Sequence, residues 1–117
     1  MMKTARRLLA LAALSALGLC AQSLGASAEE AAKVSLTLKD HKFSPSEPTA
    51  PVHKPIVIEV ENQDKTPAEF ESKSLRVEKV VPGGGKITVQ VRPLPPGRYR
   101  FYDDYHESTT QGFLVTQ

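Results

Sequence analysis

The sequence of residues 29–117 predicts an all-β protein, an antiparallel β-sandwich, on three observations. Apolar and polar residues alternate with a period of two in several short segments, as in strands with one buried face. Clusters of proline, glycine and small polar residues separate these segments at regular distances, which is typical of sandwiches and barrels. No stretch of this part of the chain keeps the 3.6-residue period of an amphipathic helix.

Five strands can be placed in order from this pattern. The first four have an apolar or aromatic residue at every second position, and the fifth is a short apolar run after a glycine. The expected strands cover residues 34–38, 56–60, 87–91, 99–103 and 112–117. The sequence PGGGK at residues 82–86 predicts a hairpin turn that joins Val80 and Val81 to the third of these strands. It lacks the spacing and the Ser or Thr of a phosphate-binding loop.

Residues 1–28 are predicted to be a cleaved export signal. A basic start precedes an apolar run over residues 8–19, and residues 26–28 (Ala-Ser-Ala) form a cleavage motif. The apolar run is too short to span a bilayer, so we expect a periplasmic domain with no membrane insertion after cleavage. Two alternatives stay open, a twin-arginine signal and a lipoprotein anchored through Cys20.

Cleavage after Ala28 would change the composition of the exported domain. It would remove the only cysteine and both methionines, so no disulfide could stabilise the remaining residues. A domain this small then needs a sufficient apolar core, or a metal or partner. The full chain has 15 Lys and Arg against 13 Asp and Glu, but three of the basic residues belong to the signal. The small acidic excess that remains gives no argument for nucleic-acid binding.

The segment YRFYDDYHE, residues 99–107, ends a predicted strand in groups that could bind a metal. Tyr99, Phe101 and Asp103 share one face, and the two aromatic residues make that face the buried one. A lone buried carboxylate is costly unless it is paired or bound to a metal. Because His106 follows after two residues, its ring is close enough to turn back toward Asp103. Asp103 and Asp104 could instead cap a tight turn.

A second acidic pair lies in the segment EFES. Glu69 and Glu71 share one face of an extended segment, with Phe70 on the other. Two carboxylates on one face repel each other unless a cation or a basic group lies between them. The alternative is a solvated strand face whose charges are paired with Lys73 or Lys86.

Several motifs together resemble the cupredoxins, the copper-protein sandwiches. They are HKFSPSEPTAPVHKPIVIEVEN at residues 41–62, PGRYRFY at 96–102, the histidine at 106, and GFLV at 112–115. The resemblance covers nearly all of residues 29–117 and implies a Greek-key β-sandwich. On the cupredoxin pattern, Asp103 takes the place of the ligand cysteine and His106 that of a ligand histidine. The methionine position falls near Thr110, and the other histidine position falls at Ala68 or Glu69.

These replacements imply a different metal chemistry from that of blue copper. A blue-copper site needs a thiolate, and residues 29–117 contain no cysteine. Oxygen ligands with one or two imidazoles suit iron, Cu(II), manganese or zinc.

The motifs EFES, LRVEKVVPGGG and DD are similar to one branch of this fold, the cupredoxin-like periplasmic components of bacterial iron-uptake systems, which include the EfeO-type N-terminal domain. That resemblance implies acidic metal-binding positions at Glu69, Glu71 and Glu78. It also implies an iron or copper ion, and a role in binding, oxidising or delivering iron for an inner-membrane iron permease and other periplasmic iron-uptake components.

The candidate metal ligands share an oxygen or imidazole donor and a place near the expected site. They are Glu69, Glu71, Glu78, Asp103, Asp104, His106 and, from one strand away, His41. We expect the protein to be a metal-binding component of an uptake system rather than an enzyme. A copper-dependent ferroxidase and a metal-free interaction module stay open as alternatives, because a fold does not determine a function.

Overall fold

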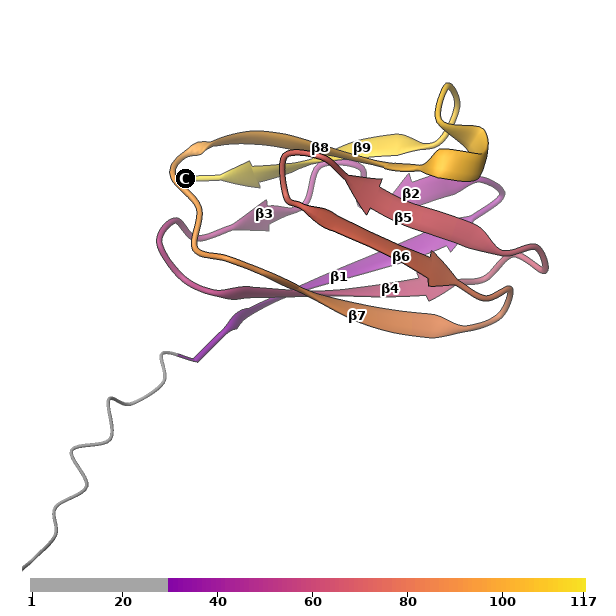
Figure 1. Ribbon diagram of the computed structural model, residues 1–117, viewed down its shortest axis with the longest axis horizontal. Helices are drawn as coiled ribbons and strands as arrows, with labels where there is room; N and C mark the ends of the chain where they lie inside the picture. The colour runs from indigo at the N-terminus through magenta and orange to yellow at the C-terminus, as the bar shows by residue number, and fades with distance from the viewer. Residues whose placement is uncertain (1–29) are drawn as a thin grey trace, which may run out of the picture.

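The computed structural model describes residues 30–117, which form a two-layered β-sandwich of nine strands and one short 3₁₀ helix (Figure 1). The elements are β1 (Ala32–Lys39), β2 (Lys42–Ser44), β3 (Thr49–Ala50), β4 (Ile56–Asn62), β5 (Ala68–Ser72), β6 (Val77–Val81), β7 (Lys86–Val91), β8 (Gly97–Asp103), η1 (Asp104–His106) and β9 (Gln111–Thr116). The predicted export signal lies outside the described residues. Within residues 30–117, no helix is long and apolar enough to cross a membrane.

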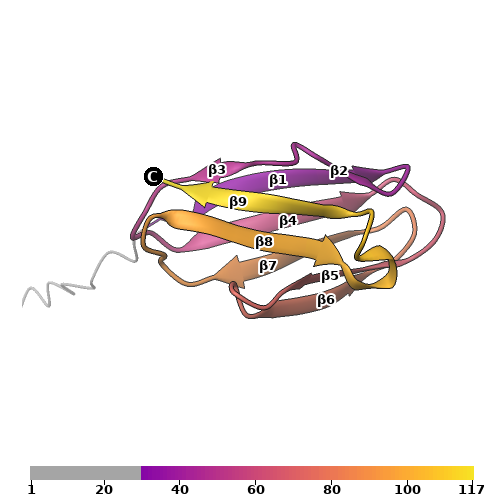
Figure 2. The same cartoon turned by 90° about the horizontal axis from the view of Figure 1, so that it is seen from above.

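The strands form two sheets, which the view in Figure 2 shows from above. One sheet has the order β2-β1-β4-β7, and the other has the order β3-β9-β8-β5-β6. The predicted all-β class is confirmed, but the prediction of purely antiparallel sheets is wrong: both sheets are mixed, because β1 pairs with β4 and β3 pairs with β9 in parallel. Parallel neighbours need a long connection. Residues 40–55 provide it for β1 and β4, since the chain visits the other sheet as β3 before it returns.

The hairpin predicted at PGGGK is wrong. β6 and β7 belong to different sheets, so residues 82–85 carry the chain from one layer to the other. Gly84 has a φ of +70°, in the region that favours glycine. A side chain at Gly83 would collide with the backbone carbonyl of Lys65, so the crossover packs directly on the β4–β5 loop.

The core between the sheets is built by the alternation seen in the sequence. β4 turns Ile56, Ile58 and Val60 inward, and each is almost fully buried. Three phenylalanines lie close together in this core. The ring of Phe43 is 6.0 Å from that of Phe70 and 5.1 Å from that of Phe101, both edge to face, and Phe70 and Phe101 are 5.4 Å apart. Aromatic rings that pack edge to face restrict one another's orientation, so these three side chains form a well-ordered part of the core.

Three connections gather at the end of the sandwich opposite the C-terminus. They are the β1–β2 turn, the loop that leads into β5, and η1 with the loop that follows it (Figures 1 and 2). His41, Asp104 and His106 lie on these connections, and Glu69 and Asp103 lie in the strands next to them, whereas Glu71 and Glu78 lie within β5 and β6.

Candidate metal centre

Asp103 is a buried carboxylate whose oxygens all have partners. It is the last residue of β8, and its side chain is 1% exposed. Its Oδ1 accepts hydrogen bonds from the backbone N–H groups of Glu69 (2.9 Å) and Tyr105 (3.1 Å). Its Oδ2 lies 3.1 Å from Nδ1 of His106. These contacts offset the cost of burying the carboxylate.

His106 meets Asp103 because a single turn of 3₁₀ helix follows the strand. Asp103 caps η1 by accepting the Tyr105 N–H, and this turn carries His106 back over the end of β8. The contact is a hydrogen bond when Nδ1 is protonated. The same two atoms could instead share a metal ion, because an imidazole nitrogen and a carboxylate oxygen are both ligands for divalent transition metals.

His41 comes to this pair from the other sheet. Lys39 pairs with Lys42, so Asp40 and His41 form a two-residue turn, with φ values of 51° and 57°. Two positive φ values are typical of the turns that match the twist of a hairpin. The turn places the His41 ring 4.4 Å from the His106 ring, measured between centroids.

His41, Asp103 and His106 thus form one candidate metal site. One ligand atom from each residue lies within 4.8 Å of those of the other two. The carboxylate is buried, whereas the side chains of His41 and His106 are 46% and 42% exposed. An ion could therefore reach the two imidazoles from solvent and contact the carboxylate beneath them. A site of two histidines and one carboxylate leaves coordination positions open for solvent or another ligand.

Asp64 supports the turn that carries His41. Its Oδ1 accepts the N–H of Asp40 (2.7 Å), and its Oδ2 accepts the N–H of His41 (3.0 Å) and lies 4.0 Å from His41 Nδ1. The bonds to these backbone groups, that to His41 above all, lower the pKa of Asp64, and burial opposes this shift. Asp64 was not among the predicted site residues, because nothing in its own segment of sequence points to residue 41.

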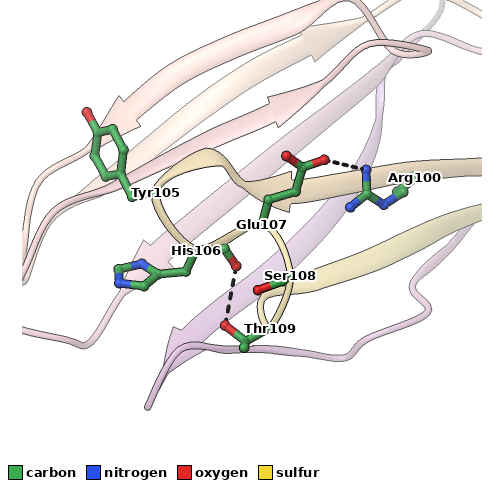
Figure 3. Close-up of a pocket in the computed structure, with 6 residues that line it drawn as sticks. All are labelled: Arg100, Tyr105, His106, Glu107, Ser108 and Thr109. Atoms are coloured by element: carbon green, nitrogen blue, oxygen red, sulfur yellow. Dashed lines mark hydrogen bonds and ion pairs between the residues drawn. The ribbon is translucent and has the colours of Figure 1, made fainter.

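A shallow hollow borders the site beside His106 (Figure 3). It is lined by Arg100, Tyr105, His106, Glu107, Ser108 and Thr109. Glu107 reaches back to Arg100 at 3.2 Å, and the Thr109 hydroxyl donates to the His106 carbonyl at 3.3 Å. Because Glu107 offsets the charge of Arg100, this cation repels a metal ion at His106 less than an unpaired arginine would.

The remaining predicted ligands form a second, separate cluster. One carboxylate oxygen from each of Glu69, Glu71 and Asp104 lies within 4.8 Å of the others. Glu78 stands opposite Glu71 on the neighbouring strand β6. Glu69 and Glu71 are half-buried and face away from the core, because Phe70 between them faces inward. The structure therefore divides the predicted ligands into two clusters, one of His41, Asp103 and His106 and the other of Glu69, Glu71 and Asp104 with Glu78 close by.

Crowding of like charges changes the acidity of this second cluster. Loss of solvent raises the pKa of Glu69, and the hydrogen bond and charge of Glu78 add to the shift. Loss of solvent also raises the pKa of Glu71, with further contributions from the charges of Asp104 and Glu78. The charge of Lys73 opposes the shift at Glu71. Lys86, the other lysine proposed as a partner of these glutamates, lies 3.5 Å from Glu59 instead. Glu69 and Glu71 therefore hold their protons more tightly than exposed glutamates do.

Comparison with known proteins places this geometry in a family context. The family model described as "Cupredoxin-like domain" matches residues 8–116. An uncharacterised protein of Rickettsia prowazekii (strain Madrid E) is 40% identical over 83 residues, which is 71% of this chain and 66% of that protein. The chain therefore spans about two thirds of the length of this curated relative.

Solved structures share the sandwich at low sequence identity. The metal-binding domain of the Cu(I)-exporting P-type ATPase CopA of Streptococcus pneumoniae D39 is 11% identical, with a TM-score of 0.62 over 73% of this chain and 84% of that chain. Auracyanin A, a blue copper protein from Chloroflexus aurantiacus, is 11% identical, with a TM-score of 0.63 over 75% and 100%. At these identities the likeness concerns the fold, and it confirms the predicted cupredoxin-like sandwich.

Proposed function

Because this chain belongs to the cupredoxin-like domain family, we propose that it binds a divalent transition-metal ion through His41, Asp103 and His106. One observation carries the proposal. Two segments from different sheets, the β1–β2 turn and the end of β8 with η1, bring one ligand atom of each residue within 4.8 Å of the others, around a carboxylate that is 1% exposed. The buried carboxylate already has partners in two backbone N–H groups and in His106. A metal ion could take the place of the His106 proton as the partner of Oδ2 and would add a positive charge beside the buried negative one.

The donor set favours iron or copper as that ion. Two imidazoles and one carboxylate suit Fe(II) and Cu(II), and zinc is the main competitor. Residues 30–117 contain no cysteine, so a thiolate cannot contribute. Copper also appears in the names of proteins with this fold, the Cu(I)-exporting ATPase domain and the blue copper protein among them. Bound at this place, the ion would be reachable from solvent through two half-exposed imidazoles.

We further propose that the ion is cargo of a periplasmic iron-uptake system, and that the protein receives iron and delivers it to an inner-membrane permease. The resemblance of the acidic motifs to periplasmic iron-uptake components supports this role. An open site at one end of a rigid sandwich also suits delivery, because a ligand on a partner could reach the ion without a change of fold.

Calorimetric titration of the processed protein with Cu(II), Zn(II) and, under anaerobic conditions, Fe(II) tests the proposal. We expect one ion per chain, and a loss of affinity of about tenfold to several hundredfold in His41→Asn and His106→Asn, where tenfold corresponds to about 1.4 kcal/mol. Asparagine is chosen because it tolerates the positive φ of His41. His53→Asn is the matched control, since His53 also has a positive φ, 59°, and lies outside both clusters. Equal affinities for all variants would refute the site.

The role in iron uptake needs a separate test. Cells that lack this protein should take up radioactive iron more slowly, and wild type should restore uptake where His106→Asn does not. If His106→Asn restored uptake fully, the metal site would not be needed for iron transport.

A further inference from the structure

Thr110 contacts all three residues of the candidate metal site. It is fully buried, in the loop between η1 and β9. Its N–H donates to the His106 carbonyl (2.9 Å), and its carbonyl accepts the Asp103 N–H (2.9 Å). Its hydroxyl Oγ1 donates to the His41 carbonyl at 2.7 Å. One residue thus ties together three ligand residues from two sheets.

We infer that Thr110 is a positioning residue, whose hydroxyl holds His41 against the Asp103–His106 pair; this inference rests on the proposed function. The two backbone hydrogen bonds could be made by any residue with the same backbone conformation. The hydroxyl bond depends on the side chain, and it joins positions that are 69 residues apart in the chain.

The hydroxyl matters because His41 has few other restraints. Its turn is exposed, and its N–H is held by Asp64 at 3.0 Å. Without the Thr110 hydroxyl, the His41 carbonyl loses its partner, and the turn is held by Asp64 and by the β1–β2 pairing that closes it, neither of which ties it to the sheet of Asp103 and His106. The imidazole can then move away from His106, and three ligand atoms no longer converge. Loss of a group that orients a metal ligand typically weakens metal binding 10- to 100-fold.

This role differs from that of a ligand. The Thr110 hydroxyl directs its proton at the His41 carbonyl, so its effect on the metal passes through His41. Removing the hydroxyl should therefore weaken binding only while the His41 imidazole is present. That dependence distinguishes a positioning role from a general contribution to stability.

The test is a Cu(II) titration, with EPR of the loaded protein, on a set of variants. Thr110→Val keeps the shape of the side chain and removes the hydroxyl, and Thr110→Ser keeps the hydroxyl. His41→Asn is made alone and together with Thr110→Val. Thr116→Val is the matched control, because Thr116 is also buried and donates its hydroxyl to a carbonyl, that of Pro95, at 2.8 Å. It lies at the end of β9 that is far from the site (Figure 1).

We expect Thr110→Val to lose 10- to 100-fold in Cu(II) affinity and to change the nitrogen splitting of the EPR signal. Thr110→Ser should restore both, and Thr116→Val should change neither. In the His41→Asn background, Thr110→Val should have no further effect on affinity.

The outcomes separate this inference from the proposed function. If His41→Asn binds Cu(II) as wild type does, the proposed site itself is refuted. If His41→Asn weakens binding and Thr110→Val does not, only the role of Thr110 is refuted. An equal loss from Thr110→Val with and without His41 also overturns it, because the effect then bypasses His41. Should Thr110→Val fail to fold, as judged by circular dichroism, Thr110→Ala removes the same hydroxyl with a smaller side chain and decides by the same criteria.

Discussion

Replacing Asp103 separates its two tasks, the support of η1 and the binding of a metal. In the structure, Oδ1 accepts two backbone N–H groups and Oδ2 faces His106. Asp103→Asn keeps one oxygen, which can still accept both N–H groups, and loses the charge. Asp103→Ala loses the charge and the acceptor together. Comparing the two variants therefore divides the effect of the charge from that of the hydrogen bonds.

The expected losses follow from the number of groups left without a partner. In Asp103→Ala, two N–H donors lose their acceptor, at about 1–3 kcal/mol for each that is shut off from water. We expect the free energy of unfolding to fall by about 2–5 kcal/mol without metal. Asp103→Asn should lose about 1–2 kcal/mol, the part that comes from bonds to a charged acceptor. Both variants should bind Cu(II) at least about tenfold more weakly, a change of 1.4 kcal/mol or more.

Urea unfolding at constant m-value measures the first effect, and calorimetric titration measures the second. Glu61→Gln is the control, because it removes the same charge from an exposed residue that belongs to neither cluster. If Asp103→Ala were no less stable than Asp103→Asn, the two N–H bonds would not be what supports η1. If Asp103→Asn bound Cu(II) as tightly as wild type, Asp103 would not be a ligand.

Three further predictions concern acidity, colour and processing. Because the pKa of Glu71 is raised above 4.5 in the folded state, the folded protein holds its proton more tightly than the unfolded chain does. The burial of this carboxylate and the negative charges around it cost no stability well below pH 4.5, and they destabilise the metal-free protein as pH rises from there through the raised pKa. Glu71→Gln should therefore be more stable than wild type in urea at pH 7 and equal to it at pH 3. No difference at pH 7 would mark the cluster as solvated surface. The Cu(II)-loaded protein should be pale, with an EPR signal of oxygen and nitrogen ligands, and an intense blue band would contradict the ligand set. Intact mass of the exported protein should match a chain that begins at Glu29, whereas a lipid-modified start at Cys20 would show another processing route.

The strands with clear alternation were predictable, and the short ones were not. β1, β4 and β7 each place large apolar residues at alternate positions, and burial of that face fixes the register. In β8 the alternation of Tyr99 and Phe101 was readable although Tyr102 is buried as well, and β9 was predicted from its apolar run after a glycine. β2 and β3 have three and two residues, so no period can be read from them. The predicted hairpin at residues 82–86 failed because a glycine-rich turn signal does not tell whether the next strand stays in the same sheet or crosses to the other.

The candidate site was predictable where its residues are close in the chain. Asp103 and His106 are three residues apart, and alternation along β8 places the carboxylate on the buried side. The third residue of the cluster could not be predicted in the same way, because it depends on which turn of the other sheet lies beside Asp103 and His106. The structure brings His41 to the pair, and the two ties that hold it, from Asp64 and Thr110, come from distant segments.

The same alternation explains why the acidic pair does not join this site. A period of two that sends Phe70 into the core must send Glu69 and Glu71 to the opposite face, whereas Asp103 points to the core side. Only the backbone of Glu69 reaches Asp103, through its N–H. The acidic side chains would therefore act on an ion bound at His41 and His106 through their electrostatic field and not by coordination. Salt largely screens such a field between exposed charges that are more than about 10 Å apart at 0.1 M, whereas a direct bond to Asp103 would be affected much less. Ionic strength would thus distinguish the two clusters: the acidic one would speed the approach of a cation mainly at low salt, whereas coordination by the proposed site of Asp103, His41 and His106 should depend less on salt.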